Sequence, residues 1–466
     1  MKKITVFLII LVLPLLTACN NDINPANEKF LEEFDYLTQL MEDTFPYFGV
    51  AERRLGIDIR KLATKARTII KNYPYSLQEF AADLGITLED MPEMDEHVFW
   101  SIISHEFLNH FNLLAHIGVN RFDVHDILNP FSYDPDFPLS EFYYLAFNNT
   151  ITQDFYENQK RLFEQLPHEQ DSLFYFIFRR NPDDVDMETP LTHPVVEITT
   201  EILEESHIAY VSISNFMTDD LHHYYDILIE FYREIQDYDH LIIDIRDNYG
   251  GSPAFWKFLI MYQLWMDRSN MPNMPLYAFF NGSELDRFLA EAHIEARLAT
   301  GGLSVYVPET NLLPIDEVLE SSSLPEVNEL DLQDLAYGVR FNTSLVNFAR
   351  HTANIPGVLS THPFAGNIWL LTNEESRSAA ALFARHAKYM DFATLVGEST
   401  GGWYTTGPRA FFSLPTTGIV VTWDIDYLVD QYGRALEEFP TTPHHFNISG
   451  LDALETVLML IAEGNY

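Results

Sequence analysis

The chain has 466 residues, enough for about three domains at most, and this length excludes a mini-protein without a substantial buried core. Its 69 acidic residues outnumber 28 lysines and arginines, and the resulting net charge of −41 repels phosphate backbones, so nucleic acid is not expected as a partner. Hydrophobic residues at 47% and aromatic residues at 14% exclude a disordered acidic polymer and indicate a globular protein with a solvated acidic surface.

The N-terminus has the residue order of a bacterial secretory signal. Two lysines precede an apolar run over residues 4–16, and the only cysteine of the chain, Cys19, follows in the sequence Leu-Thr-Ala-Cys. This pattern resembles a lipobox, in which the chain is cut before the cysteine and the cysteine is then acylated. We therefore expect a signal peptide over 1–18, lipidation of Cys19, a tether over 19–27 and attachment to the extracytoplasmic face of the cell membrane. A plain signal peptide or an uncleaved anchor helix is the alternative.

Helical periodicity dominates the first 120 residues. Apolar side chains recur every three or four positions, which predicts helices over 30–45, 62–70, 77–84 and 98–114 and a helical N-terminal domain over 28–120. Residues 121–192 are rich in Asp, Pro, Phe and Tyr without a clean period. This connecting region therefore receives no predicted architecture.

From about residue 193 the pattern becomes that of an α/β core reaching to 466. Short apolar runs predict strands at 208–213, 240–245, 367–371, 394–396 and 418–423. Amphipathic stretches predict helices at 221–235, 255–265 and 378–390. Strands that alternate with helices favour an α/β fold. The polar stretch over 266–364 is predicted to be a long insertion over that core.

Two turns of this core carry residues suited to chemistry. Gly250 and Gly251 follow the strand at 240–245, where their backbone N–H groups can approach a ligand and donate to a developing negative charge. An ordinary turn is the alternative. In the second turn, Ser376 and Ser378 lie between a strand and a helix, a place that favours acyl transfer because free helix N-terminal N–H groups lie beside it. Either serine could instead only cap the helix.

Histidines give no comparable metal signal. His105 and Glu106 with His110 look like the zinc motif H-E-x-x-H, but the two histidines are five residues apart instead of four. That spacing rotates the two rings off a single helix face. No metal ion and no cofactor are expected.

Three blocks in this order resemble the core of the S41 peptidases, the family of the C-terminal processing proteases and the tricorn core. The blocks read LIIDIRDNYGG (241–251), PFAGNIWLLTNEESRSAAALFARHAKYMDFATLVGESTGG (363–402) and GRALEEFPTTP (433–443). The resemblance implies an α/β core of the ClpP/crotonase type. It also implies that the nucleophile is the serine eighteen residues before Val396, which is Ser378, with Ser376 as the alternative.

The chain departs from the Ser-Lys branch of that family. The lysine of that branch lies in the turn after V-G-E, where this chain has Gly401-Gly402-Trp403, and Ala381 stands where many relatives have an acidic residue. The tricorn-like branch uses a histidine from the upstream helical segment and a glutamate near the end of the core. The block FNLLAHIGV resembles the histidine segment and implies His116, and the last block implies Glu437, with Glu438 as the fallback.

The resemblance implies a membrane-anchored serine peptidase acting on peptides or proteins without a cofactor. His116 would take the serine proton, Glu437 would orient the imidazole directly or through water, and N–H groups of Ala379 and Gly250 or Gly251 would form the oxyanion hole. A non-catalytic lipoprotein that binds a ligand or protein on the same core is the rival interpretation. A membrane-tethered scaffold is the third.

Overall fold

The computed structural model describes most of the chain. It covers residues 25–122, 140–165, 176–177, 195–218, 220–266, 272–299, 306–342, 362–407 and 409–464. The predicted signal peptide over 1–18 and the lipidation of Cys19 lie outside these described residues. Across them, none of the helices combines the length and the apolar character needed to cross a bilayer.

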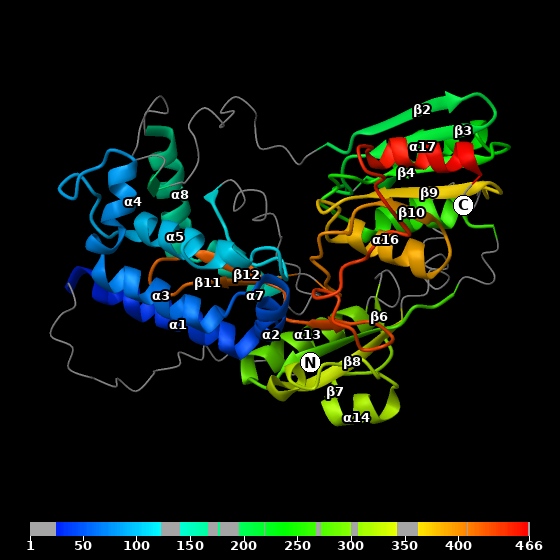
Figure 1. Cartoon of the computed structure of the whole chain (residues 1–466). Coiled ribbons are helices and arrows are strands. Elements are labelled where there is room, and N and C mark those ends of the chain that lie inside the picture. Colours follow the sequence, from blue (N-terminus) through cyan, green and yellow to red (C-terminus); the bar gives the residue numbers. More distant parts are fainter. Residues whose placement is uncertain are drawn as a thin grey trace.

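Helices form the N-terminal part of the fold, at the left of Figure 1. They are α1 (Glu28–Thr44), α2 (Phe48–Val50), α3 (Ile59–Asn72), α4 (Gln78–Asp83) and α5 (Glu96–His105), joined later by α7 (Ser140–Asn148) and α8 (Thr150–Gln165). The helices predicted over 30–45, 62–70 and 77–84 are confirmed. The helix predicted over 98–114 ends at His105, and a 3-10 turn at Leu108–Phe111 follows, because Phe107 leaves helical backbone angles.

The end of the predicted tether belongs to the folded part. Pro25–Asn27 forms a 3-10 turn that runs directly into α1. The buried amide of Asn27 donates hydrogen bonds of 3.0 Å to the carbonyls of Ile70 and Tyr73. A buried amide of this kind is held by its hydrogen bonds, so residues 25–27 are not a free tether.

A six-stranded sheet forms the α/β core, at the upper right of Figure 1. Its strand order is β14 (His445–Phe446), β10 (Thr394–Gly397), β9 (Asn367–Thr372), β4 (His240–Asp244), β3 (Ile208–Ile213) and β2 (Ile198–Glu204). All neighbours are parallel except β2 and β3. The central strand β4 is buried along its whole length, as expected where helices cover both faces of a parallel sheet. Four of the predicted strands are thereby confirmed.

Helices cover both faces of this sheet. On one face α10 (Leu221–Glu234) and α16 (Ala379–Tyr389) share a hydrophobic core with Leu241 and Ile243, and on the other α17 (Ala453–Glu463) packs against Ile242 and Trp369. The predicted helix at 255–265 is a continuous helical segment made of α11 (Pro253–Phe255), a π-helical stretch at Trp256–Met261 and α12 (Tyr262–Leu264).

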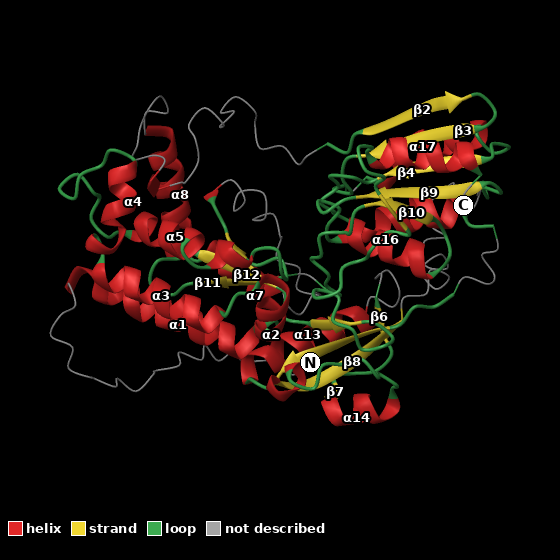
Figure 2. Cartoon of the chain, in the orientation of Figure 1, coloured by secondary structure: helices red, strands yellow, loops and turns green. Residues whose placement is uncertain are grey.

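The predicted insertion over 266–364 builds a second sheet. Its strands are β5 (Leu276–Asn281), β8 (Leu335–Asn342), β6 (Val307–Pro308) and β7 (Leu313–Pro314), accompanied by α13 (Glu284–Ala299) and α14 (Ile315–Ser321). A strand from the far end of the chain, β13 (Tyr427–Val429), completes it by pairing antiparallel with β5. The strands are yellow in Figure 2, with this sheet below the other two. The segment is therefore a layer of the fold and not an appended loop.

The fifth predicted strand lies outside the α/β core. It forms β12 (Val420–Trp423) in a three-stranded antiparallel sheet with β1 (Gly118–Val119) and β11 (Ala410–Ser413). This sheet shares one hydrophobic core with the N-terminal helices, because β11 and β12 bury Phe411 and Val421 in the same cluster as Phe34 and Phe107. The expected boundary at residue 120 therefore does not coincide with a boundary between hydrophobic cores.

Candidate active site

Ser378 lies at the sharp turn between β9 and α16. Its backbone has φ 52° and ψ −121°, a conformation that costs a non-glycine residue energy and that persists where the surroundings impose it. Those surroundings include a 2.8 Å hydrogen bond from the Ser378 amide to the carbonyl of Gly402. The turn holds the hydroxyl at the N-terminus of α16, as expected for an exposed nucleophile on a strained strand-to-helix turn.

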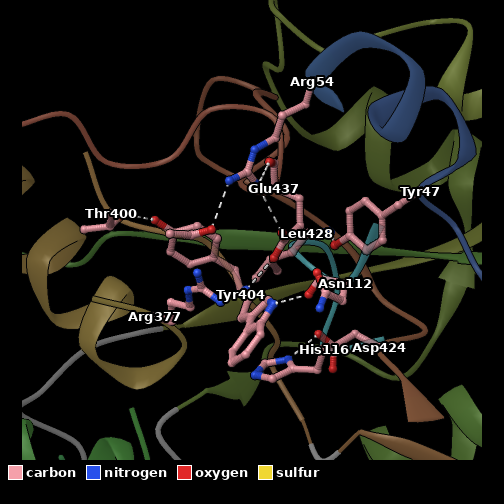
Figure 3. Close-up of polar contacts among 12 residues, drawn as sticks. Tyr47, Arg54, Asn112, His116, Arg377, Thr400, Tyr404, Asp424, Leu428 and Glu437 are labelled. Atoms are coloured by element: carbon pink, nitrogen blue, oxygen red, sulfur yellow. Dashed lines mark hydrogen bonds and ion pairs between the residues drawn. The ribbon is translucent and has the colours of Figure 1, made fainter. Parts of the chain in front are cut away.

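His116 reaches this serine from the segment just before β1. Its Nε2 lies 3.1 Å from Ser378 Oγ, and its Nδ1 lies 2.6 Å from Oδ2 of Asp424. When Asp424 is ionised, its carboxylate can only accept a hydrogen bond, and in that state Nδ1 carries the proton and Nε2 is free to accept the serine proton. Figure 3 shows His116 and Asp424 pointing toward each other.

The pairing of β1 with β12 brings Asp424 to His116. Gly118 is opposite Thr422 in this antiparallel pair, so extending the register by two residues places His116 opposite Asp424. The amide of Asp424 also donates a 2.8 Å hydrogen bond to the carbonyl of Ala115. Two residues 308 positions apart in the chain are thus joined by one strand register.

Burial sets the protonation of this pair. Desolvation, reinforced by the positive charge of Arg409, lowers the pKa of His116 well below its usual value, with Asp426 opposing. Desolvation also raises the pKa of Asp424, and Arg409 counteracts this rise. The imidazole is therefore neutral at neutral pH, which is the state that a general base requires.

Trp403 covers the imidazole from the glycine turn that carries no lysine. The ring centroids of Trp403 and His116 are 5.2 Å apart. The indole N–H donates a 2.9 Å hydrogen bond to the carbonyl of Asn112, and the guanidinium of Arg377 lies 4.9 Å above the indole. These contacts fix the indole, which covers the imidazole of His116.

Glu437 is near the site but does not contact the imidazole. It is fully buried, and its Oε1 accepts a hydrogen bond of 2.5 Å from the amide of Tyr404, while its Oε2 lies 3.6 Å from Arg54. Desolvation raises its pKa to about 8. The place at His116 Nδ1 that the sequence resemblance assigned to Glu437 is taken by Asp424, because the β1–β12 register delivers that carboxylate instead.

The two fallback residues have other partners. Ser376 is buried, and its hydroxyl donates a 2.8 Å hydrogen bond to the carbonyl of Ile245. Glu438 binds the guanidinium of Arg53 through two hydrogen bonds of 2.6 and 2.8 Å. Neither residue contacts His116 in the structure.

Two of the residues predicted to form the oxyanion hole, Gly250 and Ala379, lie against Ser378. A Cβ placed on Gly250 would lie 2.8 Å from Ser378 Cβ and 2.9 Å from the amide nitrogen of Ala379, so only glycine allows this approach. The Gly250 amide donates to Oδ1 of Asn248 at 2.9 Å. Within the described ranges, the amides of Ala379 and Gly251 make no hydrogen bond to another backbone group.

Asp424 was not identified from the sequence. It is one of 69 acidic residues, and it lies outside the three blocks that carry the family resemblance. The one signal that pointed toward it was its position directly after a predicted strand. For metals, no group of three His, Cys, Asp or Glu side chains suited to an ion occurs among the residues that the structure describes.

A known sequence family matches most of the α/β core. The sequence model of peptidase family S41 matches residues 207–272 and 300–445. None of the curated proteins matches the chain.

Solved structures resemble the chain over nearly its whole length. A protein from Parabacteroides merdae ATCC 43184 is 14% identical (94% of this chain, 97% of that one, TM-score 0.45). Mature CPAF is 15% identical (91% and 93%, TM-score 0.45). A lipoprotein from Streptococcus agalactiae is 11% identical (95% and 98%, TM-score 0.41). At these values the likenesses carry no argument about activity.

Proposed function

Because the chain belongs to peptidase family S41, we propose that it is a serine peptidase that hydrolyses peptide bonds with Ser378, His116 and Asp424. The observation that carries the proposal is the unbroken contact chain from Ser378 Oγ to His116 Nε2 at 3.1 Å and from His116 Nδ1 to Asp424 at 2.6 Å. A core retained only for ligand binding has no need of a strained serine aligned on a neutral imidazole. Peptidase activity therefore accounts for this geometry better than the binding interpretation does.

The reaction follows from these contacts. Ser378 Oγ forms a bond to the substrate carbonyl carbon while its proton passes to His116 Nε2, and Asp424 stabilises the resulting imidazolium. His116 then gives that proton to the amine nitrogen as the C–N bond breaks. A water molecule next loses a proton to His116 and attacks the acyl carbon, and His116 returns the proton to Ser378 as the acid leaves. A positioned base of this kind contributes about 10²- to 10⁴-fold in rate.

The oxyanion is assigned to the amides of Ala379 and Gly251. Ala379 is the first residue of α16, so its N–H has no partner within the helix and lies at the positive end of the helix dipole. Each such donor contributes about 10²- to 10³-fold. Gly250, whose amide donates to Asn248, serves by letting the backbone come close.

Glu437 is assigned a positioning role. By accepting from the Tyr404 amide and facing Arg54, it holds the turn of Gly401, Gly402 and Trp403 that covers the imidazole. Arg54 fastens the same turn through a 2.9 Å hydrogen bond to the carbonyl of Gly401. The glutamate therefore acts on His116 through the turn.

Covalent labelling tests the proposal without a known substrate. A fluorophosphonate probe should attach to Ser378, whose Oγ displaces fluoride from phosphorus, and the bond should be found by mass spectrometry of the digest. Ser378→Ala should abolish the labelling and all peptide cleavage. Ser376→Ala is the matched control and should keep both, since Ser376 bonds a backbone carbonyl away from His116. Equal labelling of wild type and Ser378→Ala would refute the assignment.

The anchor is a separate part of the proposal. The basic, apolar and small-residue order that ends at Cys19 supports secretion and acylation, which would leave the peptidase on the extracytoplasmic face of the cell membrane. Metabolic labelling with palmitate should mark the wild type and fail in Cys19→Ala. A Cys19→Ala variant that still incorporates palmitate would rule out this anchor.

A further inference from the structure

Arg409 stands beside the acid of the proposed triad. It directly precedes β11, in which Ala410 is opposite Trp423 of β12. One further step in this antiparallel register sets Arg409 opposite Asp424. Residues directly opposite each other share a face of the sheet and have Cβ atoms about 4.5–5.5 Å apart. The arginine therefore projects from the same face as the carboxylate that holds His116.

The guanidinium of Arg409 has unused donors. It is half-buried, and it lies 5.7 Å from the ring centroid of Phe411, two residues along the same strand face. Among the residues that the structure describes, it makes no hydrogen bond and no ion pair within 4.0 Å, although it has five N–H donors. None of its nitrogens belongs to the buried polar atoms without a partner in the described part of the chain, so these donors reach the surface and are accessible to a ligand.

Neighbouring arginines differ in this respect. Arg54 donates to the carbonyls of Glu437 and Gly401, at 2.7 and 2.9 Å. Arg377 donates to the Glu374 carbonyl and to the Glu375 carboxylate. These two guanidinium groups bind the turns of the site, whereas Arg409 makes no hydrogen bond or ion pair to any residue that the structure describes.

A role in stabilising the charge of Asp424 does not by itself explain the orientation of the Arg409 guanidinium. If its task were only to keep that carboxylate ionised, an ion pair with Asp424 Oδ1 would satisfy both groups. Oδ1 is instead buried without a hydrogen-bond partner in the described part of the chain, and the guanidinium lies over Phe411. The orientation leaves the donors of Arg409 open to a group from outside the chain.

The charge of Arg409 also opposes catalysis until it is neutralised. Together with the larger effect of burial, it lowers the pKa of His116 and so disfavours the imidazolium that must form. An anion paired with the guanidinium would remove this repulsion at the moment when His116 takes the serine proton. A bound carboxylate would thus both fill the donors and assist the proton transfer.

We propose that Arg409 selects the substrate by binding a carboxylate of the peptide close to the scissile bond. The inference rests on the proposed function and gives it a substrate class, namely peptides with an Asp or Glu side chain, or a free α-carboxylate, near the cleavage point. A carboxylate within three residues of the scissile bond lies within about 10 Å of it along an extended chain. Arginine suits this task because its planar fork binds carboxylates through two hydrogen bonds.

The net charge of the protein opposes a preference for acidic peptides. A chain with a charge of −41 repels acidic peptides at long range, so its overall field favours neutral or basic substrates. Selection of acidic peptides has to come from a local cation with free donors. A measured acidic preference would therefore not follow from the composition.

Paired peptides test the inference on the full chain purified in detergent. Internally quenched peptides are compared with Asp or Glu against Asn or Gln at each of the three positions on either side of the scissile bond. A second arm compares free and amidated C-termini placed one to three residues after it. One charge-assisted contact corresponds to about 10- to 100-fold in kcat/KM in favour of the carboxylate. The responding arm tells whether the carboxylate belongs to a side chain or to a chain end.

Variants of Arg409 identify the residue responsible. Arg409→Gln should reduce the preference to below threefold, and Arg409→Glu should reverse it toward lysine-containing peptides, by roughly 10-fold for one charge-assisted contact. Arg409→Lys should retain a weaker preference, because lysine keeps the charge without the fork. Arg161→Gln, on the exposed face of α8, is the matched control and should behave as wild type.

The outcomes separate this inference from the proposed function. If the fluorophosphonate labels Ser378 while neutral and acidic peptides are cleaved equally, the selection by Arg409 is refuted and the peptidase stands. A preference that survives in Arg409→Gln also refutes it. If Ser378 is neither labelled nor needed for cleavage, the proposed function fails and the inference fails with it. Should Arg409→Gln not fold, the wild-type preference and Arg409→Lys decide the matter.

Discussion

Replacing Asp424 with asparagine tests the proposed relay most directly, because the side chain keeps its shape and loses its charge and one acceptor. In the wild type Oδ2 lies 2.6 Å from His116 Nδ1, and Oδ1 is buried without a hydrogen-bond partner among the described residues. An asparagine amide therefore has two orientations, and each has a defined cost.

In the first orientation the amide NH₂ faces His116 Nδ1. The imidazole proton then moves to Nε2, which can no longer accept the proton of Ser378. In the second orientation the amide oxygen faces Nδ1 and the tautomer is kept. The NH₂ group then occupies the position of Oδ1, buried without an acceptor and opposite the cation Arg409, which costs about 1–3 kcal/mol.

Neither orientation leaves a charge to stabilise the imidazolium. We therefore expect kcat/KM of Asp424→Asn to fall by about 10²- to 10⁴-fold, which corresponds to about 2.7–5.4 kcal/mol in transition-state stabilisation. Cleavage of a quenched peptide measures kcat and KM, and circular dichroism verifies the fold. The loss should appear in kcat, since Asp424 does not face the substrate.

Glu437→Gln provides the comparison that can refute this reasoning. Glutamine keeps the acceptor for the Tyr404 amide, and Glu437 does not contact the imidazole. The kcat/KM of Glu437→Gln should therefore fall by less than about tenfold. If Asp424→Asn retained more than a tenth of the wild-type activity, or if Glu437→Gln were the more damaged enzyme, the assignment of Asp424 would be wrong.

Further expectations concern the pH dependence of stability, two glycines with positive φ, and Trp403, which covers His116. Burial raises the pKa of Glu437 from about 4.5 to about 8, so the stability that its proton contributes is complete below pH 4.5 and is lost as the pH rises to 8, at about 1.4 kcal/mol per pH unit. Denaturant unfolding at about pH 5, 7 and 9 should show Glu437→Gln gaining on the wild type with pH, and a constant difference would contradict this. Gly250→Ala should abolish activity and lower Tm, because its φ is 104° and the new Cβ would lie 2.8 Å from that of Ser378. Gly56→Ala, with φ 71° and no atom within 4 Å, should cost about 1–2 kcal/mol in stability and leave kcat/KM unchanged. Trp403→Ala should move the acid limb of the kcat/KM profile to higher pH, because hydration of His116 raises its pKa toward the ordinary value; an unmoved limb would show that the indole does not desolvate it.

Local patterns were sufficient for most of the secondary structure and for the serine. The strands β3, β4, β9 and β10 and the helices α1, α10 and α16 lie where apolar periodicity predicts them. Periodicity predicts these elements because each one buries one face or both, and burial of a face produces a local pattern of apolar residues in the sequence. The same local pattern indicated the strand-to-helix turn that holds Ser376 and Ser378, and the resemblance to the S41 blocks then selected Ser378.

The assembly of the sheets could not be predicted in this way. The predicted strand at 418–423 was expected in the α/β core, yet β12 pairs with β1, and the expected insertion shares a sheet with β13. Pairing partners depend on which apolar faces meet in the folded chain. No local period records that choice.

Asp424, the acid of the proposed triad, shows the same division at the level of one residue. His116 and Ser378 came from sequence blocks, whereas Asp424 meets His116 across 308 positions through the register of β1 on β12. A carboxylate has no sequence pattern of its own among 69 acidic residues. What distinguishes Asp424 is a 2.6 Å contact in a desolvated place, and such contacts exist only once distant strands have paired.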